Sequence, residues 1–187
     1  MSEPTTASAA DIVQPAVTAR LTIAPLRAAH APLLFPLLAD AANYTYIPDS
    51  ARASIAELMQ CFERLERGAP EESAEVWLNW VLLRRDTGAA VGTLQATVTP
   101  GVQAWLGYTL TPSAWGQGFA SEACAWLIAD LPRRYAVPQI LASVDVRNLK
   151  SIAVLERLGF ERSGSEAAEL HGEATVDYLY RRTCEIQ

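Results

Sequence analysis

The order of elements between residues 103 and 160 restricts the fold of this chain more than any other feature. Residues 103–110 have the pattern of a strand, apolar residues recur at helical spacing over 120–131, and residues 140–146 alternate as a second strand. A strand, a helix and a strand of these lengths form a βαβ unit with a right-handed crossover. We therefore expect the two strands to be parallel neighbours.

The segments on either side of this unit predict further strands. Residues 75–85 are apolar on both faces, residues 90–99 alternate between apolar and polar side chains, and a short turn leads into the strand at 103–110. Short turns join antiparallel neighbours. With a first strand at 20–26 and a closing strand at 173–182, we expect an α+β fold. Its sheet would be mixed, mostly antiparallel and about seven-stranded, with helices on both faces in α/β/α layers.

Three segments outside the unit's central helix are predicted to be helical, namely residues 30–42, 54–68 and 149–158. Gly68 ends the second of these helices, and Asn148 is a good N-cap for the third. An aromatic loop separates the first two.

The length of 187 residues suits one domain of ordinary size. Residues 1–18 are small, polar and interrupted by proline, so we expect a mobile tail there and a single domain over 19–187. The apolar stretches are shorter than the roughly 20 residues of a membrane helix, and no association with a membrane is expected. The start of the chain lacks the features of a signal peptide, which favours a cytoplasmic location.

The formal net charge is −6, and Lys150 is the single lysine. An acidic chain without a basic run argues against nucleic-acid binding, and it favours cationic or amine-bearing partners through electrostatic steering. The three cysteines and two histidines lack the spacing of metal ligands or redox pairs. We therefore expect no metal.

The segment Trp115–Ala120, Trp-Gly-Gln-Gly-Phe-Ala, is a glycine loop that opens the central helix. Gly116 and Gly118 allow a tight turn and a close approach of the backbone to a ligand, and Ala120 keeps the first helical turn narrow. The first amides of a helix lack intrahelical partners and carry partial positive charge. The loop thus predicts a phosphate or pyrophosphate site. The alternative is an ordinary loop with a glycine-assisted helix start.

The segment Asn148–Phe160 follows the second parallel strand, so it is expected to open beside the glycine loop. A ligand that crosses the carboxyl ends of both strands would contact both segments. Asn148 either caps its helix or bonds an amide of the ligand, and Ser151 either serves that ligand or bonds only backbone.

Together these two segments resemble the GNAT acyltransferase superfamily. Its pyrophosphate motif, Gln/Arg-x-x-Gly-x-Gly/Ala, is matched by residues 115–120, with Trp115 as a departure at the first position. The pattern Trp-Gly-x-Gly-Phe/Tyr-Ala-x-Glu-Ala, and Asn-x-x-Ser-x-x-x-Leu-Glu-x-Leu-Gly-Phe from Asn148 to Phe160, are similar to the branch that contains the bacterial ribosomal-protein N-terminal acetyltransferases. The resemblance is tight over 103–160 and looser over the rest of 20–183.

The resemblance implies a sheet that splays between the strands at 103–110 and 140–146, with acetyl-CoA as co-substrate in the splay. The backbone amides of residues 116–120 would hold its pyrophosphate, the Tyr108–Leu110 edge would pair with pantetheine, and Asn148 would bond the pantetheine arm. The 3′-phosphate would meet a basic residue near the second motif. The implied cofactor-binding set is Tyr108, Thr109, Leu110, Trp115, Gly116, Gln117, Gly118, Phe119, Ala120, Asn148 and Ser151, and the basic candidates are Arg147, Lys150 and Arg157.

The implied activity is an N-acetyltransferase that transfers an acetyl group to a primary amine, on a protein N-terminus or a small molecule, by direct attack. The amine must lose its proton, and a fixed donor must meet the oxyanion. By family geometry the Leu110 N–H is that donor, where the strand bulges before Pro112, and Ser151 assists the departing sulfur. Many family members have a tyrosine at the position of Leu155.

The base stays open at this point. Glu169 and His171, before the last strand, are candidates, and a water relay needs no named base. Four aromatic residues either line an acceptor pocket or belong to the core. These are Tyr44, Tyr46, Trp77 and Trp80. A homodimer is common in similar proteins, but the sequence itself does not indicate the oligomeric state.

Two alternatives belong to other classes. A non-catalytic, regulatory domain that binds acyl-CoA would keep the groove without turnover, and the absent tyrosine leaves room for it. A nucleotide-binding or redox domain would need an acidic residue about 20 positions after the glycines. The segment Gln139–Ala142 has none, so this alternative ranks last.

Overall fold

A single sheet of eight strands runs through the computed structural model, which describes residues 13–185. Its strands are β1 (Ala16–Val17), β2 (Leu21–Pro25), β3 (Val76–Arg84), β4 (Ala90–Thr99), β5 (Gln103–Leu110), β6 (Gln139–Asp145), β7 (Glu161–Leu170) and β8 (Glu173–Thr183). The helices are α2 (Ala31–Leu38), α3 (Ile55–Arg67), α4 (Phe119–Tyr135) and α5 (Leu149–Arg157), with short 3-10 turns η1 (Ala28–His30), η2 (Ala41–Tyr44) and η3 (Pro112–Ala114).

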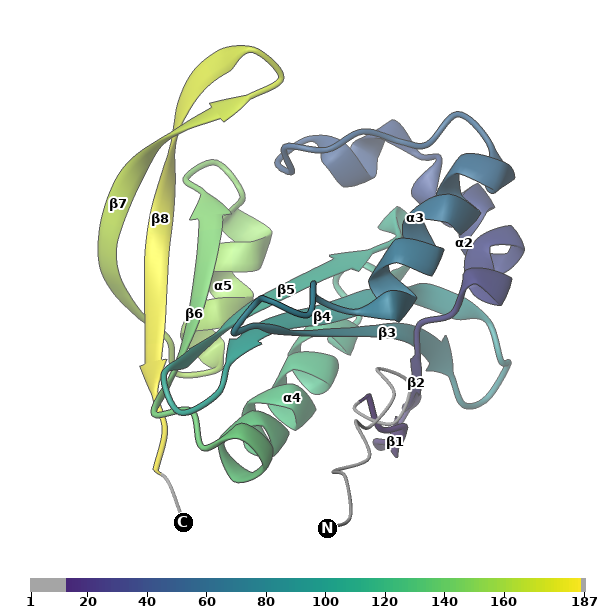
Figure 1. Cartoon of the computed structure of the whole chain (residues 1–187). Coiled ribbons are helices and arrows are strands. Elements are labelled where there is room, and N and C mark those ends of the chain that lie inside the picture. The colour runs from purple at the N-terminus through teal and green to yellow at the C-terminus, as the bar shows by residue number, and fades with distance from the viewer. Residues whose placement is uncertain (1–12, 186–187) are drawn as a thin grey trace, which may run out of the picture.

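The strand order is β1-β2-β3-β4-β5-β6-β8-β7, and every neighbouring pair is antiparallel except β5 and β6. Those two parallel strands pair only at Ala104↔Ile140 and Trp105↔Leu141. After Trp105 and Leu141 the two strands diverge, as Figure 1 shows. The region between the diverging parts of β5 and β6 is called the opening below. The mixed, mostly antiparallel sheet predicted from the sequence is confirmed.

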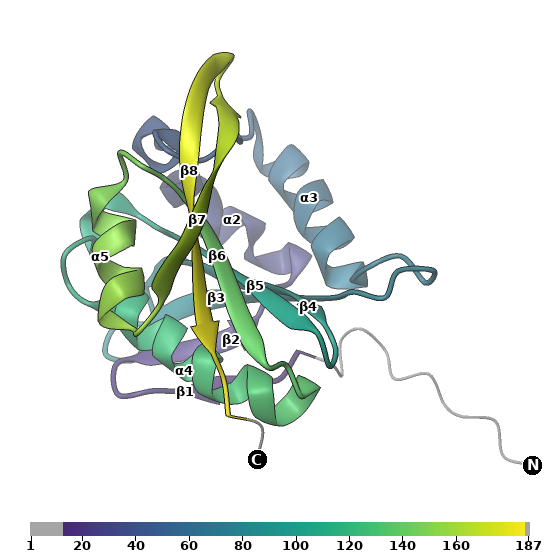
Figure 2. The same cartoon turned by 90° about the vertical axis from the view of Figure 1, so that its left-hand side faces the viewer.

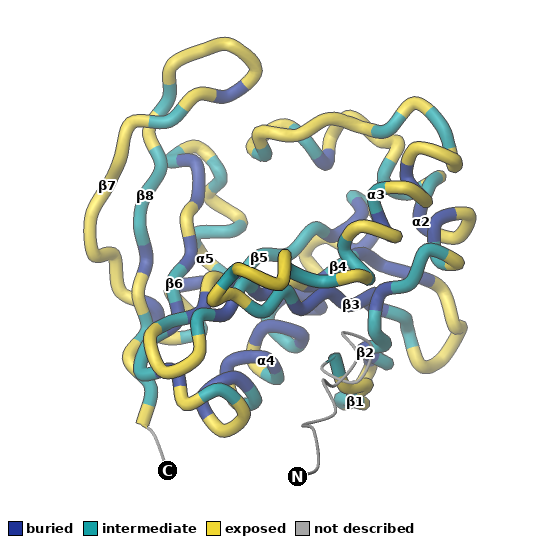
Figure 3. The backbone as a smooth tube through the Cα atoms, in the orientation of Figure 1, coloured by how far each residue is buried: buried dark blue, intermediate teal, exposed yellow. Residues whose placement is uncertain are grey.

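Helices cover both faces of the sheet, as predicted. Figures 1 and 2 show α2 and α3 on one face and α4 with α5 on the other. The larger core cluster lies between the sheet and α4, and a smaller one lies beneath α2 and α3 (Figure 3). The alternation predicted for 90–99 is confirmed, because Leu94, Ala96 and Val98 are at most 2% exposed.

The end of the predicted tail belongs to the sheet. Residues 16–17 form β1, which pairs with β2, and the Trp80 indole N–H donates to the Gln14 carbonyl at 3.0 Å. The tail prediction is therefore wrong for residues 13–18, whereas residues 1–12 lie outside the described part of the chain.

Two elements differ from the sequence prediction. The helix expected over 30–42 is divided into η1, α2 and η2, because the extended Asp40 accepts a hydrogen bond from the Ala42 N–H and starts a new turn. Strand β7 was not predicted. It is an edge strand that is exposed along most of its length, so its sequence carries no apolar alternation.

Candidate functional site

The edge of β5 that faces the opening has free backbone groups. In the β4–β5 ladder Gly92 lies opposite Leu110, and the Thr111 N–H donates to the Val91 carbonyl at 3.0 Å. Hydrogen-bonded pairs alternate in an antiparallel ladder. The N–H groups of Tyr108 and Leu110 therefore point away from β4, toward the opening.

The bulge expected at Leu110 lies elsewhere, so that expectation is wrong in its position. The register of β4 with β5 is continuous, and the shift occurs between Leu82 and Leu83 in the β3–β4 pair. Strand alternation alone directs the Leu110 N–H into the opening. Gly92, with φ 152°, allows β4 to pass close to the backbone of Thr109.

The glycine loop begins α4 at one end of the opening. Gly116 and Gly118 have φ of 71° and 81°, the left-handed region that glycine adopts without strain. The first intrahelical bond runs from the Glu122 N–H to the Gly118 carbonyl. The amides of Phe119, Ala120 and Ser121 precede it and have no acceptor within the helix. This geometry suits a phosphate group.

Trp115 connects the loop to both sides of the opening. Its indole N–H donates to the Leu110 carbonyl at 2.7 Å, and the Lys150 ammonium lies 4.4 Å from its ring centroid. The departure from the family motif therefore has a structural role here. Lys150 is the basic candidate beside the loop, because Arg147 is ion-paired with Asp145 and Arg157 lies at the far end of α5.

The start of α5 brings the second motif to the opening. The Asn148 carboxamide oxygen accepts from the Ser151 N–H at 3.2 Å, so Asn148 is the helix cap. The hydroxyl of Ser151 lies 2.8 Å from that of Tyr108 on β5. Burial raises the pKa of Tyr108 to about 12, although the bond with Ser151 acts in the opposite direction.

One polar network at the loop was not predicted from the sequence. Arg20 at the start of β2 donates to the Gln117 carbonyl at 2.8 Å and stacks on the Phe119 ring. Glu122 holds Arg20 in place through an ion pair at 2.7 Å. A charged residue more than 90 positions before the loop gave no local signal of this contact.

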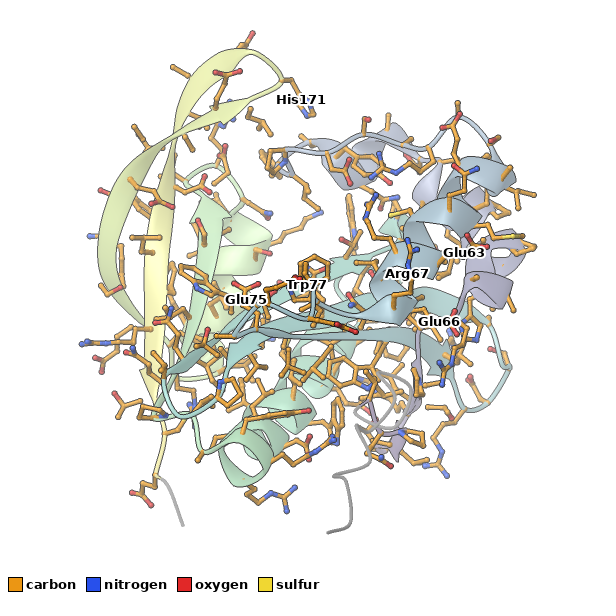
Figure 4. All side chains as sticks on the ribbon, viewed as in Figure 1. Glu63, Glu66, Arg67, Glu75, Trp77 and His171 are labelled. Carbon is orange, nitrogen blue, oxygen red and sulfur yellow. The ribbon has the colours of Figure 1, made fainter. Side chains whose placement is uncertain are left out.

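The predicted bases lie in the hairpin of β7 and β8. Glu169 is exposed in β7 and makes no ion pair with any residue within 13–185. His171 occupies the hairpin turn with φ 54°, and its Nε2 lies 2.8 Å from the Tyr44 carbonyl oxygen. Figure 4 shows His171 at the hairpin tip, on the side of η2.

The four aromatic candidates for an acceptor pocket separate into different environments. Trp80 is fully buried against Trp126, with ring centroids 5.3 Å apart, so of the two alternatives left open for it the core is confirmed. Trp77 and Glu66 both line a small cavity. Figure 4 shows Trp77 on β3 and Glu66 on α3. The Tyr44 hydroxyl donates to the Leu38 carbonyl, and Tyr46 is 37% exposed.

No group of His, Cys, Asp or Glu within the described residues could hold a metal ion. None of the helices in that part of the chain is long and apolar enough to cross a membrane. The cytoplasmic location, the homodimer and the extent of the domain outside residues 13–185 stay predictions.

The comparison with protein families decides the relationship. The model of the GNAT acetyltransferase domain matches residues 20–161. The chain belongs to the GNAT acetyltransferase family. Among curated proteins, the uncharacterized N-acetyltransferase YoaA of Bacillus subtilis is 30% identical over 89 residues, which are 46% of this chain and 50% of that protein. The match thus spans half the length of this curated relative.

Solved acetyltransferase structures share the fold. RimL, a ribosomal L7/L12 alpha-N-protein acetyltransferase in complex with coenzyme A, superposes with a TM-score of 0.80 at 21% identity, covering 93% of this chain and 100% of RimL. The microcin C7 self-immunity acetyltransferase MccE, in complex with acetyl-CoA and AMP, gives 0.77 at 18% identity, covering 96% and 98%. A GNAT from Bacillus anthracis gives 0.77 at 17%, covering 91% and 98%.

Proposed function

We propose that this protein is an N-acetyltransferase that transfers the acetyl group of acetyl-CoA to a primary amine. The observation that carries the proposal is the opening between β5 and β6, which has a free backbone edge on one side and the first amides of α4 at its end. The acetyl-CoA and coenzyme A bound to MccE and RimL support this choice of co-substrate.

Different residues around the opening would bind different parts of acetyl-CoA. The amides from Gly116 to Ala120 would hold the pyrophosphate. On the edge from Tyr108 to Leu110, the N–H and C=O groups of Tyr108 are offered to the amides of pantetheine, since the Leu110 carbonyl already accepts from Trp115. Asn148 uses its oxygen as a helix cap, which leaves its NH₂ group for the pantetheine arm. Lys150 would meet phosphate charge beside the loop.

The chemistry follows from the same edge. The amine nitrogen attacks the thioester carbonyl, a C–N bond forms, and negative charge develops on the carbonyl oxygen. The Leu110 N–H faces the opening and would donate to this oxygen. The C–S bond then breaks, and Ser151 would meet the departing sulfur. Glu169 or a water chain would accept the proton of the amine.

The acceptor is proposed to be a protein N-terminus or a small amine. RimL is named for acetylating an alpha-amino group of a ribosomal protein, which supports the first class. The acidic net charge of the chain favours a cationic acceptor of either class.

Calorimetric titration with acetyl-CoA tests the site. We expect the wild-type protein to bind and Gly118→Glu to lose binding. A side chain is strained at φ 81°, its Cβ would lie 3.3 Å from the Arg20 guanidinium that supports the loop, and the new carboxylate adds negative charge beside the phosphate site. Gly101→Glu is the matched control, since Gly101 also has positive φ, 73°, but lies in the β4–β5 turn. Equal binding by both variants, or none by the wild-type protein, would refute the site.

Release of the CoA thiol with a panel of amines and N-terminal peptides tests the activity. Turnover that Gly118→Glu abolishes and Gly101→Glu retains would support the transferase. Binding of acetyl-CoA without turnover across the panel would favour the regulatory acyl-CoA-binding domain instead.

A further inference from the structure

Two hydroxyl groups meet across the opening that the proposed function assigns to acetyl-CoA. Tyr108 lies on β5 beyond Trp105, the last residue of β5 that pairs with β6. Ser151 lies in the first turn of α5, which follows β6. Their oxygens are 2.8 Å apart, so this hydrogen bond connects β5 to α5 in the region where β5 and β6 no longer pair.

The chemistry of the two groups indicates the direction of this bond. A phenol is a stronger acid than an aliphatic alcohol, so Tyr108 is the better donor and Ser151 the better acceptor. Serine in a helix often donates to the carbonyl four residues earlier, but the Ser151 hydroxyl has Tyr108 as its hydrogen-bond partner among residues 13–185. With Tyr108 as donor, the hydrogen of Ser151 is free to point into the opening.

This arrangement gives the side-chain hydroxyl of Tyr108 a role in addition to that of its backbone groups. We propose that Tyr108 is a positioning residue whose hydroxyl orients and polarises Ser151, so that Ser151 donates a hydrogen bond to the sulfur that leaves as a thiolate. Donation into Ser151 strengthens the bond that Ser151 makes in turn. Because this inference rests on the proposed function, it fails if acetyl-CoA does not bind.

The acceptor nitrogen bonds to the carbonyl carbon, the C–S bond breaks, and its electron pair goes to sulfur. The proton lost by nitrogen reaches sulfur through water. Tyr108 keeps its own proton, because burial raises the pKa of the phenol to about 12. Leu155 occupies the position at which many family members have a tyrosine, and it is 3% exposed in the core. Helix α5 therefore supplies no phenol there.

The test measures the pKa of the CoA thiol on the protein and needs no acceptor. Thiolate absorbance is followed in an ultraviolet pH titration of the CoA complex, after subtraction of the same titration with S-methyl-CoA. The proteins are the wild type, Tyr108→Phe, Ser151→Ala and the double variant. Tyr135→Phe is the matched control, because the buried Tyr135 hydroxyl has no hydrogen-bond partner among the described residues.

We expect each single variant at the pair to raise the pKa of the bound thiol by about one unit, a tenfold loss of thiolate at a given pH. The double variant should equal Ser151→Ala, because Tyr108 acts through Ser151. Tyr135→Phe should match the wild type, and all variants should bind CoA. With a productive acceptor, Tyr108→Phe should lower kcat about tenfold and leave KM for acetyl-CoA unchanged.

Each other outcome has one meaning. If Tyr108→Phe gives the wild-type pKa for the thiol, or if the two effects add in the double variant, the positioning role is refuted while the proposed function stands. If the wild-type protein binds neither CoA nor acetyl-CoA, the proposed function and this inference are both refuted.

Discussion

The carboxylate of Glu122 in α4 accepts three hydrogen bonds, and two of them come from Arg20. The Arg20 backbone N–H and side-chain Nε donate at 2.7 Å each, and the Thr18 hydroxyl donates at 2.6 Å. Because the same guanidinium also donates to the Gln117 carbonyl, the start of β2 holds the glycine loop from behind. The glutamate of the Trp-Gly-x-Gly-Phe/Tyr-Ala-x-Glu-Ala pattern therefore supports the site through Arg20.

Glu122→Gln should destabilise the protein and loosen the loop. The amide keeps one accepting oxygen and loses the charge that pairs with Arg20, so we expect a loss of about 1–3 kcal/mol in the free energy of unfolding. Weaker acetyl-CoA binding should accompany it. Urea unfolding and calorimetry measure the two effects. Asp86→Asn is the control, since its exposed ion pair with Arg84 should contribute little.

The charge of Glu122 also makes this support sensitive to acid. Burial alone would raise the pKa of Glu122, but the bonds from Thr18 and Arg20 outweigh it, and the net pKa is lowered. A lowered pKa stabilises the fold above the unfolded-state value and loses that contribution as the pH falls through the folded-state value. The difference between wild type and Glu122→Gln should therefore shrink at acidic pH, and a constant difference would contradict this account.

Gly92→Ala should damage both the fold and the β5 edge. A Cβ at Gly92 would collide with the Thr109 carbonyl oxygen and lie 2.9 Å from Leu110 Cα, and the backbone φ of 152° is itself unfavourable. Overpacking of this kind costs about 1–3 kcal/mol. Denaturant unfolding should show the loss, and acetyl-CoA should bind more weakly to the folded fraction. Gly101→Ala is the control, because a Cβ there meets nothing within 4 Å.

Asp145 should give the protein a second acid-sensitive contribution. Asp145, 3% exposed at the end of β6, accepts from Arg147 and from the Thr175 hydroxyl. The Arg147 side chain is the main cause that lowers the pKa of Asp145 to about 2. The stabilisation is present above the unfolded pKa of about 3.9 and is lost as the pH falls toward 2.

Asp145→Asn tests this assignment. We expect it to lower the unfolding free energy by about 1–2 kcal/mol near neutral pH, a modest amount because the half-exposed Arg147 is screened by water. The difference from wild type should disappear at the acidic end of a series of urea unfolding curves. A difference that persists below the folded-state pKa would show that Asp145 acts through packing instead.

The sequence predicted the elements whose patterns are local. Strand periodicity placed β4 and β5, and the glycine loop and the Asn148 cap placed the starts of α4 and α5. The family resemblance then connected these elements to a cofactor groove. These features depend on neighbouring residues along the chain, which a pattern can reveal.

The contacts that cross the fold could not be predicted in this way. The Tyr108–Ser151 pair and the Arg20–Glu122 pair join residues 43 and 102 positions apart. Strand β7 has too few apolar residues to show alternation, and Trp80 has the same local pattern whether it faces a pocket or the core. Only the packing of the sheet against α4 and α5 decides these cases.

The hairpin tip should be held against η2 by His171. Its ring nitrogen and the Tyr44 carbonyl oxygen are 2.8 Å apart, and the β7–β8 hairpin otherwise projects beyond the sheet (Figures 1 and 4). His171→Asn removes this bond but tolerates the left-handed backbone, φ 54°. We expect faster amide hydrogen exchange near residues 167–176 and 41–46, because exchange reports local opening. The global unfolding free energy should hardly change, since His171 is exposed.

His30→Asn, in η1, is the matched control and should leave exchange at the hairpin tip as in the wild type. Unaltered exchange at both segments in His171→Asn would show that the twist of the hairpin alone keeps its tip beside η2.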